Sequence, residues 1–245
     1  MRKPFQGVLN IIKFNWHFYV IAFLLISTLL IFINFFPTNF SLFIYLLIAS
    51  IILGTSVSLL ASFYIYDISN LYSLNWLNDL QVDNNVQILN INAGFDETSQ
   101  LLQGKYPNAN IKALDFYNPL KHTEISIERA RKAYPPYPGT ELIETTCINV
   151  APSSADFIFL IFAAHEIRDQ NEQISFFKQL KTILKADGKI IVVEHNRDIY
   201  NFLVYNFGFF HFFSPKRWRA VFKDAGLNLY HKKKITPFIN VYYLN

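Results

Sequence analysis

Residues 171–195 read NEQISFFKQLKTILKADGKIIVVEH and carry two successive apolar patterns. The first part places apolar side chains at helical spacing, at positions 174, 176, 177, 180, 183 and 184. Residues 189–193 then form a short, nearly continuous apolar run, which is typical of a strand buried on both faces. We therefore expect a helix over residues 171–184 followed by a strand, with Gly188 in the left-handed conformation that ends many helices.

Further apolar runs of strand length lie before and after this stretch, at residues 86–90, 111–114, 157–162, 227–230 and 238–244. Helical stretches separate them. Strands that alternate with helices predict an α/β domain, built on a mostly parallel sheet with helices on both faces. We assign residues 86–245 to this domain.

The N-terminal part is very different, because no Asp, Glu, Lys or Arg occurs between Lys13 and Asp67. A helix needs about 20 apolar residues to cross a bilayer, and Pro37 interrupts the window near its middle. Residues 1–66 are therefore predicted to form a transmembrane hairpin, with spans at 16–36 and 40–66. Residues 67–85 show helical spacing and are expected to form a juxtamembrane helix or linker that docks on the domain. A signal peptide is the alternative, but the apolar run is too long and lacks a cleavage site of small residues.

Basic residues set the expected orientation of this hairpin. Arg2, Lys3 and Lys13 precede the first span, and the turn between the spans carries no charge. The positive-inside rule then puts the N-terminus and the α/β domain in the cytoplasm, beside an inner or plasma membrane. The lone Cys147 cannot form an internal disulfide, which agrees with a reducing compartment.

Outside the hairpin the charges nearly balance. Of the 22 basic residues, three precede the first span, and the remaining 19 face 18 acidic residues, which leaves +1. This balance argues against a nucleic acid partner. Seven basic residues and one acid between Lys216 and Lys234 give a local charge of +6. That cluster either approaches anionic lipid headgroups or forms a solvated helix face and a lysine-rich edge strand.

Candidate ligand-binding residues lie in the loop after the first apolar run. In open α/β sheets, ligands bind at the carboxyl ends of the strands, near the point where the strand order reverses. Gly94 lies in this loop, and Asp115 ends the next run 21 residues later. That spacing is typical of an acid that binds a ribose, although a turn glycine and a helix-capping acid are the plainer interpretation.

Three ordered segments resemble the class I S-adenosylmethionine-dependent methyltransferases, in particular those of quinone biosynthesis. Residues 154–169 resemble the fourth strand and its loop, residues 176–194 resemble the helix, turn and strand that follow, and residues 213–227 resemble the late helix that ends at a glycine. The resemblance covers about residues 86–244. It implies a Rossmann-like methyltransferase domain that binds S-adenosylmethionine.

The resemblance also implies roles for individual residues, and the expected cofactor-binding residues are Asn90, Asn92, Gly94, Asp115 and Cys147. Asp115 matches the acid that binds the adenosine ribose, and Cys147 lies in the region that flanks the adenine. Asn90 stands where the family has an acid, while Asn92 and Asp96 stand at glycine positions. The altered loop keeps a second hypothesis open, a non-catalytic module, tethered to the membrane, that binds a partner.

Methyl transfer is an in-line displacement, so catalysis depends mainly on positioning, with a base where the acceptor loses a proton. The catalytic candidates follow two strands and should meet at one rim: His165, Glu166, Glu194 and His195. Structural roles are the plainer interpretation of each. We expect no metal site, because residues 165–169 lack the second histidine of a zinc-protease helix and the chain has a single cysteine.

Two segments are candidates to shape an acceptor pocket, residues 122–139 and the aromatic-rich residues 201–213. The second is a core segment, a lid or a membrane contact. Beside a membrane hairpin, such a pocket would suit a small lipophilic substrate. We therefore expect a membrane-anchored methyltransferase whose partner is the lipid bilayer, and the sequence does not indicate an oligomeric state.

Overall fold

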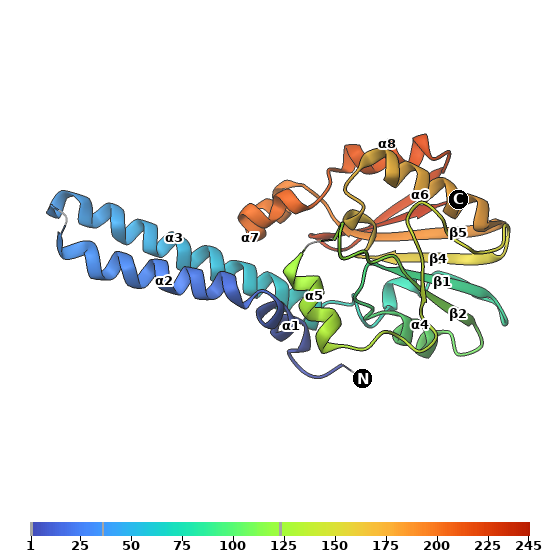
Figure 1. Cartoon of the computed structure of the whole chain (residues 1–245), viewed down its shortest axis with the longest axis horizontal. Helices are drawn as coiled ribbons and strands as arrows, with labels where there is room; N and C mark the ends of the chain where they lie inside the picture. The colour runs from blue at the N-terminus through green and yellow to red at the C-terminus, as the bar shows by residue number, and fades with distance from the viewer. Residues whose placement is uncertain (1, 36, 123) are drawn as a thin grey trace.

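The computed structural model describes residues 2–35, 37–122 and 124–245, which form a long helical hairpin and an α/β domain (Figure 1). A short helix, α1 (Gln6–Phe14), lies where the two parts meet. The hairpin pairs α2 (Trp16–Phe32) with α3 (Thr38–Phe63), and these helices continue as short turns, η1 (Ile33–Phe35) and η2 (Tyr64–Ile68). The stretches Trp16–Phe35 and Thr38–Ile68 are each long and apolar enough to cross a membrane.

The domain is built on a seven-stranded sheet with the order β3-β2-β1-β4-β5-β7-β6. The first five strands are parallel, and β7 runs antiparallel to β5 and β6. The strands are β1 (Gln87–Asn92), β2 (Asn110–Asp115), β3 (Glu141–Leu142), β4 (Ala155–Ile161), β5 (Leu184–His195), β6 (Leu229–Thr236) and β7 (Ile239–Leu244). The predicted α/β fold is confirmed, and β3 was not predicted because two exposed residues carry no apolar pattern.

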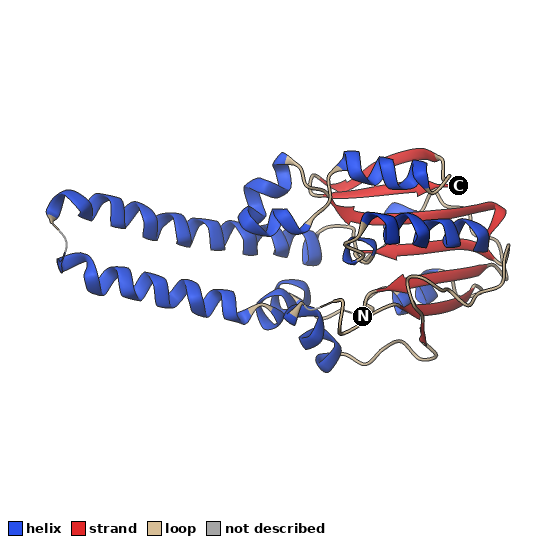
Figure 2. Ribbon diagram, turned by 45° about the horizontal axis from the view of Figure 1, so that its top comes forward, coloured by secondary structure: helices blue, strands red, loops and turns tan. Residues whose placement is uncertain are grey.

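Helices lie on both sides of the sheet (Figure 2). On one face, α6 (Gln170–Ile183) and α8 (Pro215–Asp224) bury Phe176, Phe177 and Trp218 against the sheet. The opposite face is covered by α4 (Ser99–Lys105) and by residues 65–77. Because successive strand residues point to opposite faces, the two cores draw on alternate positions of the same strands.

The segment after the hairpin docks on the domain as expected, but it does not form the predicted helix. After η2 it runs through turns and one short helix, η3 (Asn75–Leu77). Leu71, Leu74 and Leu77 are buried against the sheet. Leu74 has a φ of 55°, which interrupts helical geometry. The leucines recur every three residues, as they would in a helix, but here consecutive turns place each of them against the sheet.

The predicted left-handed conformation of Gly188 is also wrong. Strand β5 begins at Leu184, directly after α6, and Gly188 is part of that strand. A Cβ atom at this position would lie 2.8 Å from Leu184 Cγ and 3.0 Å from the Asp156 carbonyl oxygen. Gly188 is therefore required for close packing, whereas α8 is followed by a left-handed glycine, Gly226, with φ +74°.

Helix α1 joins the hairpin to the domain. The backbone amides of Gly7 and Val8 donate to the Asp67 carboxylate at 2.7 and 2.8 Å, so an acid at the end of the second long helix caps the first turn of α1. Arg2 forms an ion pair with Glu97, in the loop after β1, at 2.6 Å. The N-terminal segment and the α/β domain therefore lie at the same end of the hairpin.

Candidate functional site

Four parallel strands end at one edge of the sheet. Asn92 pairs with Asp115 at the ends of β1 and β2, and Ile161 pairs with Val193 near the ends of β4 and β5. The strand order reverses between β1 and β4, which is where ligands bind in open α/β sheets. The predicted cofactor residues follow β1 and β2, and the predicted catalytic residues follow β4 and β5.

The loop after β1 is held by its own side chains. The Asn92 amide donates to the Leu114 carbonyl at 3.1 Å, and its oxygen accepts from the Gly94 amide at 3.0 Å. Asp96 caps α4, because its Oδ1 accepts from the amides of Thr98 and Ser99 at 2.9 Å each. Two buried oxygens, Asn90 Oδ1 and Asp96 Oδ2, have no hydrogen-bond partner among the described residues.

Helix α5 (Ile125–Ala133) closes over this loop. Its Arg131 forms an ion pair with the buried carboxylate of Asp115 and donates to the Gly94 carbonyl at 3.2 Å. The cavity that remains has a volume of about 50 Å³, against roughly 300–1,000 Å³ for a typical small-molecule pocket. Arg131 also lines a neighbouring cavity of about 520 Å³, together with Tyr117 and His122.

Helix α1 covers the same loop from the hairpin side. The Phe95 ring packs edge-to-face on Phe14 of α1, with ring centres 5.6 Å apart, and contacts Tyr134 after α5 at 5.4 Å. Asn90, Asn92, Gly94 and Asp115 therefore lie together in an enclosed site. Cys147 is exposed and lines neither cavity, and its place beside an adenine stays a prediction.

Three of the four predicted catalytic residues meet at the rim after β4 and β5. His165 and Glu166 lie in the short helix η4 (Ala164–Glu166), and Glu194 lies near the end of β5. His165 Nδ1 is 2.7 Å from Glu194 Oε2, and His165 Nε2 is 3.2 Å from Glu166 Oε1. All three side chains are nearly buried.

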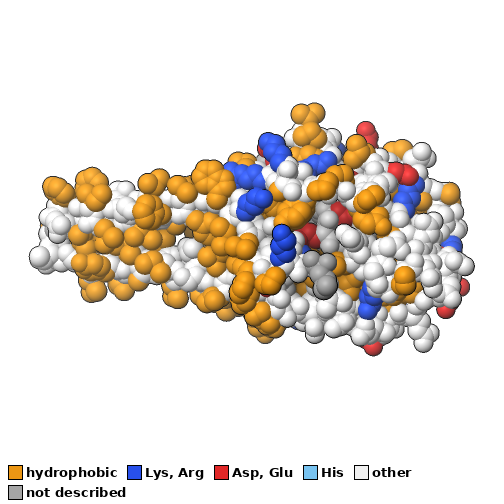
Figure 3. All heavy atoms as spheres, turned by 90° about the horizontal axis from the view of Figure 1, so that it is seen from below, with side chains coloured by type: hydrophobic (Ala, Val, Ile, Leu, Met, Phe, Trp, Pro, Cys, Tyr) orange, Lys and Arg blue, Asp and Glu red, His pale blue; other side chains and the backbone are white. Residues whose placement is uncertain are grey.

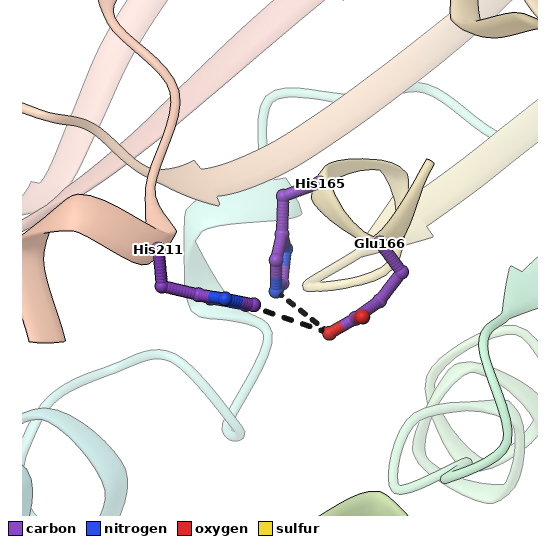
Figure 4. Close-up of side chains that lie close together, drawn as sticks. All are labelled: His165, Glu166 and His211. Atoms are coloured by element: carbon purple, nitrogen blue, oxygen red, sulfur yellow. Dashed lines mark ion pairs between the residues drawn. The ribbon is translucent and has the colours of Figure 1, made fainter. Parts of the chain in front are cut away.

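Two residues from the segments expected to shape an acceptor pocket, His211 and Glu124, complete this cluster, although neither was predicted as a catalytic residue. His211, at the end of the short helix η5 (Asn206–His211), has Nδ1 2.9 Å from Glu124 Oε1 and Nε2 3.6 Å from Glu166 Oε1. Figure 4 shows both imidazoles directed at the Glu166 carboxylate. Residues 201–213 contain one histidine among many aromatic residues, and that single imidazole was the available signal.

The cluster shifts the pKa of its members in opposite directions. Burial would lower the pKa of His165, but the carboxylates of Glu194 and Glu166 raise it well above its usual value. Burial likewise opposes the effect of Glu124 and Glu166, which together raise the pKa of His211. Burial would raise the pKa of Glu166, yet hydrogen bonds from both histidines lower it. Because a protonated imidazole cannot accept a proton, His165 is a poor base in this arrangement.

His195 does not join the rim, which corrects the prediction that all four candidates meet there. Adjacent strand residues point to opposite faces of a sheet, so His195 points away from Glu194. Its ring stacks between Phe162 and Phe212, with ring centres 5.2 and 4.7 Å away. Nε2 lies 3.0 Å from the Tyr66 hydroxyl at the end of the hairpin. Burial lowers the pKa of His195 to about 4.

The expectation of no metal site rested on the local motif at residues 165–169 and on the single cysteine, and it did not consider a histidine from elsewhere in the chain. The fold brings a second histidine to that motif from residue 211. Ligand atoms of His165, Glu166 and His211 all lie within 4.8 Å of one another, which makes them a group able to hold a metal ion.

No family model and no curated protein sequence matches the chain. Solved structures do match. A methyltransferase dependent on S-adenosylmethionine from Aquifex aeolicus is 14% identical, with a TM-score of 0.51 over 78% of this chain and 97% of that one. One from Clostridium acetobutylicum is 12% identical, with a TM-score of 0.51 over 71% and 89% of the two chains. One from Methanosarcina mazei is 14% identical, with a TM-score of 0.50 over 66% and 92%.

At these identities the comparisons define the fold. The α/β domain has the Rossmann-like fold of the S-adenosylmethionine-dependent methyltransferases, as the resemblance of the three sequence segments implied.

Proposed function

We propose that this chain is a membrane-anchored methyltransferase that uses S-adenosylmethionine and acts on a lipophilic acceptor in or at the bilayer. One observation carries the choice of acceptor: the segment that exposes apolar side chains beside the hairpin ends at His211, inside the rim cluster. The proposed membrane contact and the candidate active site therefore belong to one short piece of chain.

Exposure of the hairpin supports the membrane anchor. The apolar windows of its two long helices are 0% and 11% buried, which favours membrane spans over core helices, since core helices are mostly buried. Hydrophobic side chains cover the hairpin and continue onto the adjoining end of the domain, where basic side chains also gather (Figure 3). Apolar surface of this extent is typical of contact with lipid.

The aromatic segment lies along the hairpin. Helix α7 (Ile199–Tyr205) contacts α3, and Asn206 Nδ2 would lie 3.3 Å from a Cβ atom placed on Gly54. From Gly54 to the end of α3 is about 14 Å at 1.5 Å per residue, so the segment flanks the last part of the helix. Leu203, Phe207 and Phe210 are 62%, 88% and 58% exposed. These exposures favour insertion into the membrane interface, among the three roles that the sequence left open.

The polar groups of the first loop fit the proposed cofactor, although the cleft is too small for it. Asn90 Oδ1 and Asp96 Oδ2 are buried acceptors without partners, available to an ammonium group, and Asp115 stands where an acid would bind a ribose. In the proposed enzyme Arg131 therefore leaves Asp115 when the cofactor enters. Bound cofactor would supply the methyl group, and the chain's own residues would position the acceptor against it.

The rim supplies groups that could orient an acceptor. The Glu166 carboxylate faces His165 and His211, and a hydroxyl or amine of the acceptor could hydrogen-bond to it. In-line methyl transfer depends chiefly on such positioning.

The closed cleft favours a second candidate function, a membrane-tethered module without catalytic activity. In that case the Arg131–Asp115 ion pair is a permanent structural element that replaces the ligand. The two candidates differ in whether the first loop binds S-adenosylmethionine at all.

Isothermal titration of the full-length protein in lipid nanodiscs separates them. The enzyme hypothesis expects saturable binding of S-adenosylmethionine that weakens about tenfold or more in Asp115→Asn, since a hydrogen bond to a charged group is lost. Asp187→Asn, at an exposed acid after α6, is the matched control and should bind normally. Absence of heat in the wild-type protein would reject the enzyme and favour the module.

We further propose that the domain faces the cytoplasm, where S-adenosylmethionine is made. The ion pair of Arg2 with Glu97 supports a common side for both termini, and the basic residues before the first span favour the inner side. In a Cys147→Ser background, Thr38→Cys should react with an impermeant maleimide in whole cells and Asn245→Cys should not. The opposite pattern would reverse the orientation.

A further inference from the structure

We propose that His165, Glu166 and His211 form a binding site for a divalent first-row transition metal ion. Two imidazole nitrogens and one carboxylate oxygen converge there, with all ligand atoms within 4.8 Å of one another. Two histidines and one carboxylate, with further positions open to water or substrate, are a recurring ligand set for such ions.

Distances between the ligand atoms suit an ion at their centre. Glu166 Oε1 lies 3.2 Å from His165 Nε2 and 3.6 Å from His211 Nε2. Zinc and similar ions bind nitrogen and oxygen at about 2.0–2.2 Å, which separates neighbouring ligand atoms by roughly 3.0 Å in octahedral and 3.4 Å in tetrahedral geometry. The side chains need only small shifts to coordinate one ion.

Each histidine is also held by a carboxylate on its other nitrogen. His165 Nδ1 is 2.7 Å from Glu194, and His211 Nδ1 is 2.9 Å from Glu124. Metal-binding histidines commonly donate their second N–H to a carboxylate, which fixes the tautomer and directs the free nitrogen at the metal. Here both Nε2 atoms are directed at Glu166, so two separate elements repeat the same arrangement.

The charges of the cluster suit a bound cation, which would take the place of the protons on the two imidazoles. Glu124, Glu166 and Glu194 surround the two imidazoles, and among the described residues no Lys or Arg forms an ion pair with any of the three. The side chains of Glu166 and Glu194 are only 7% and 1% exposed. Buried carboxylates require positive partners or metal ions. A divalent ion held by two neutral imidazoles would offset the same two negative charges that two protonated imidazoles offset in its absence.

Position gives the ion a role. Arg168 donates to the carbonyls of His165 and His211 at 3.0 and 2.7 Å, which connects the rim to the aromatic segment, residues 201–213. A bound ion would strengthen that link and present open coordination positions at the end of β4. Metal binding stands apart from methyl transfer, whereas activation of an acceptor hydroxyl by the ion rests on the proposed function.

Cobalt and zinc ions are suitable probes for full-length protein in nanodiscs after treatment with a chelator. We expect one Co²⁺ per chain, with visible absorption that reports nitrogen and oxygen ligands, and displacement of Co²⁺ by Zn²⁺. Loss of an outer carboxylate such as Glu194 should weaken Co²⁺ binding roughly 10- to 100-fold. Glu166→Gln and His211→Gln each remove a direct ligand and should weaken Co²⁺ binding by more than this. His231→Gln, at an exposed histidine on β6, is the control and should bind as the wild type does.

Binding that is absent, or that is equal in all three variants, would overturn the proposal. Thermal unfolding of each variant excludes loss of fold, and His211 is partly exposed, so its substitution should be tolerated even if Glu194→Gln fails to fold. Separate titration with S-adenosylmethionine keeps the two proposals distinct. Binding of Co²⁺ without binding of S-adenosylmethionine would support the metal site and reject the proposed methyltransferase. Binding of S-adenosylmethionine without binding of Co²⁺ would support the methyltransferase and reject the metal site.

Discussion

The loop after β1 and the rim after β4 and β5 lie at the same edge of the sheet, yet their polar groups are satisfied in opposite ways. In the loop, Asn92 and Asp96 bond to nearby backbone, and Asp115 is paired with the protein's own Arg131. At the rim, three carboxylates share two histidines. Apart from Asn90 Oδ1 and Asp96 Oδ2, which have no partner among the described residues, the loop is closed by internal partners, whereas at the rim a group of carboxylates and imidazoles converges with geometry suited to an external ligand.

The largest effect is expected at the rim. Glu166→Gln removes the carboxylate on which both histidines converge, and should lower the rate of methyl transfer about a hundredfold or more. Binding of S-adenosylmethionine should be unchanged, because Glu166 lies after β4 and does not line the cavity at Gly94. Radiolabel transfer and titration measure the two quantities, with the exposed Glu144→Gln as control. An equal loss of methyl-transfer rate in Glu166→Gln and Glu144→Gln would mean that Glu166 has no special role compared with an exposed glutamate.

The next effect is a gain of affinity at the loop. Arg131→Gln frees the Asp115 carboxylate, and cofactor affinity should rise about tenfold, since a charge-assisted hydrogen bond no longer competes with the ligand. Lys132→Gln is the matched control, because Lys132 neighbours Arg131 but pairs with the exposed Glu128 instead. Weaker binding in Arg131→Gln would mean that Arg131 helps to hold the ligand, and that the loop is not closed against it.

A third prediction concerns how the rim reaches the bilayer. In a Cys147→Ser background, an environment-sensitive dye on Phe207→Cys should be quenched by lipids that carry a quencher in the interface. Phe207 is 88% exposed beside the hairpin, whereas Tyr230→Cys, close to the C-terminus at the far end of the domain (Figure 1), should be unaffected. Equal quenching at both positions, or no quenching at position 207, would contradict the hypothesis that the aromatic segment beside the rim inserts into the membrane interface.

The smallest effect concerns His195, which lies on the opposite face of β5 from the rim cluster. His195 should remain neutral at pH 5 by NMR, since burial lowers its pKa to about 4. The unfolded chain, with a pKa of about 6.5, takes up that proton first as the pH falls. The contribution of His195 to the free energy of unfolding is therefore complete above pH 6.5. It falls by up to roughly 3 kcal/mol as the pH is lowered from 6.5 to 4. His195→Gln should lose that part of the pH dependence, and a charged His195 at pH 5 would contradict its burial.

Most of the fold could be predicted, because continuous apolar runs and helical spacing depend on local sequence alone. Helix α6 and five of the seven strands follow directly from such runs, whereas the run at residues 227–230 overlaps only the first two residues of β6, whose lysine-rich remainder carries no apolar run. Gly188 and residues 67–85 were misread, because a strand can begin directly after a helix and turns can imitate helical spacing. The site was less accessible, since His211 reaches Glu166, and Glu124 reaches His211, only through tertiary packing. Strand alternation, a local rule, would have separated His195 from Glu194.

Distribution of labelled methyl groups tests most directly whether the rim serves a membrane-resident acceptor. The full-length protein, in vesicles of its host's own lipids, would be supplied with methyl-labelled S-adenosylmethionine and the products extracted. We predict label in the lipid phase for the wild-type protein and about a hundredfold less for Glu166→Gln. Label confined to soluble molecules or to protein, or lipid labelling equal in both, would contradict a methyltransferase that works at the bilayer.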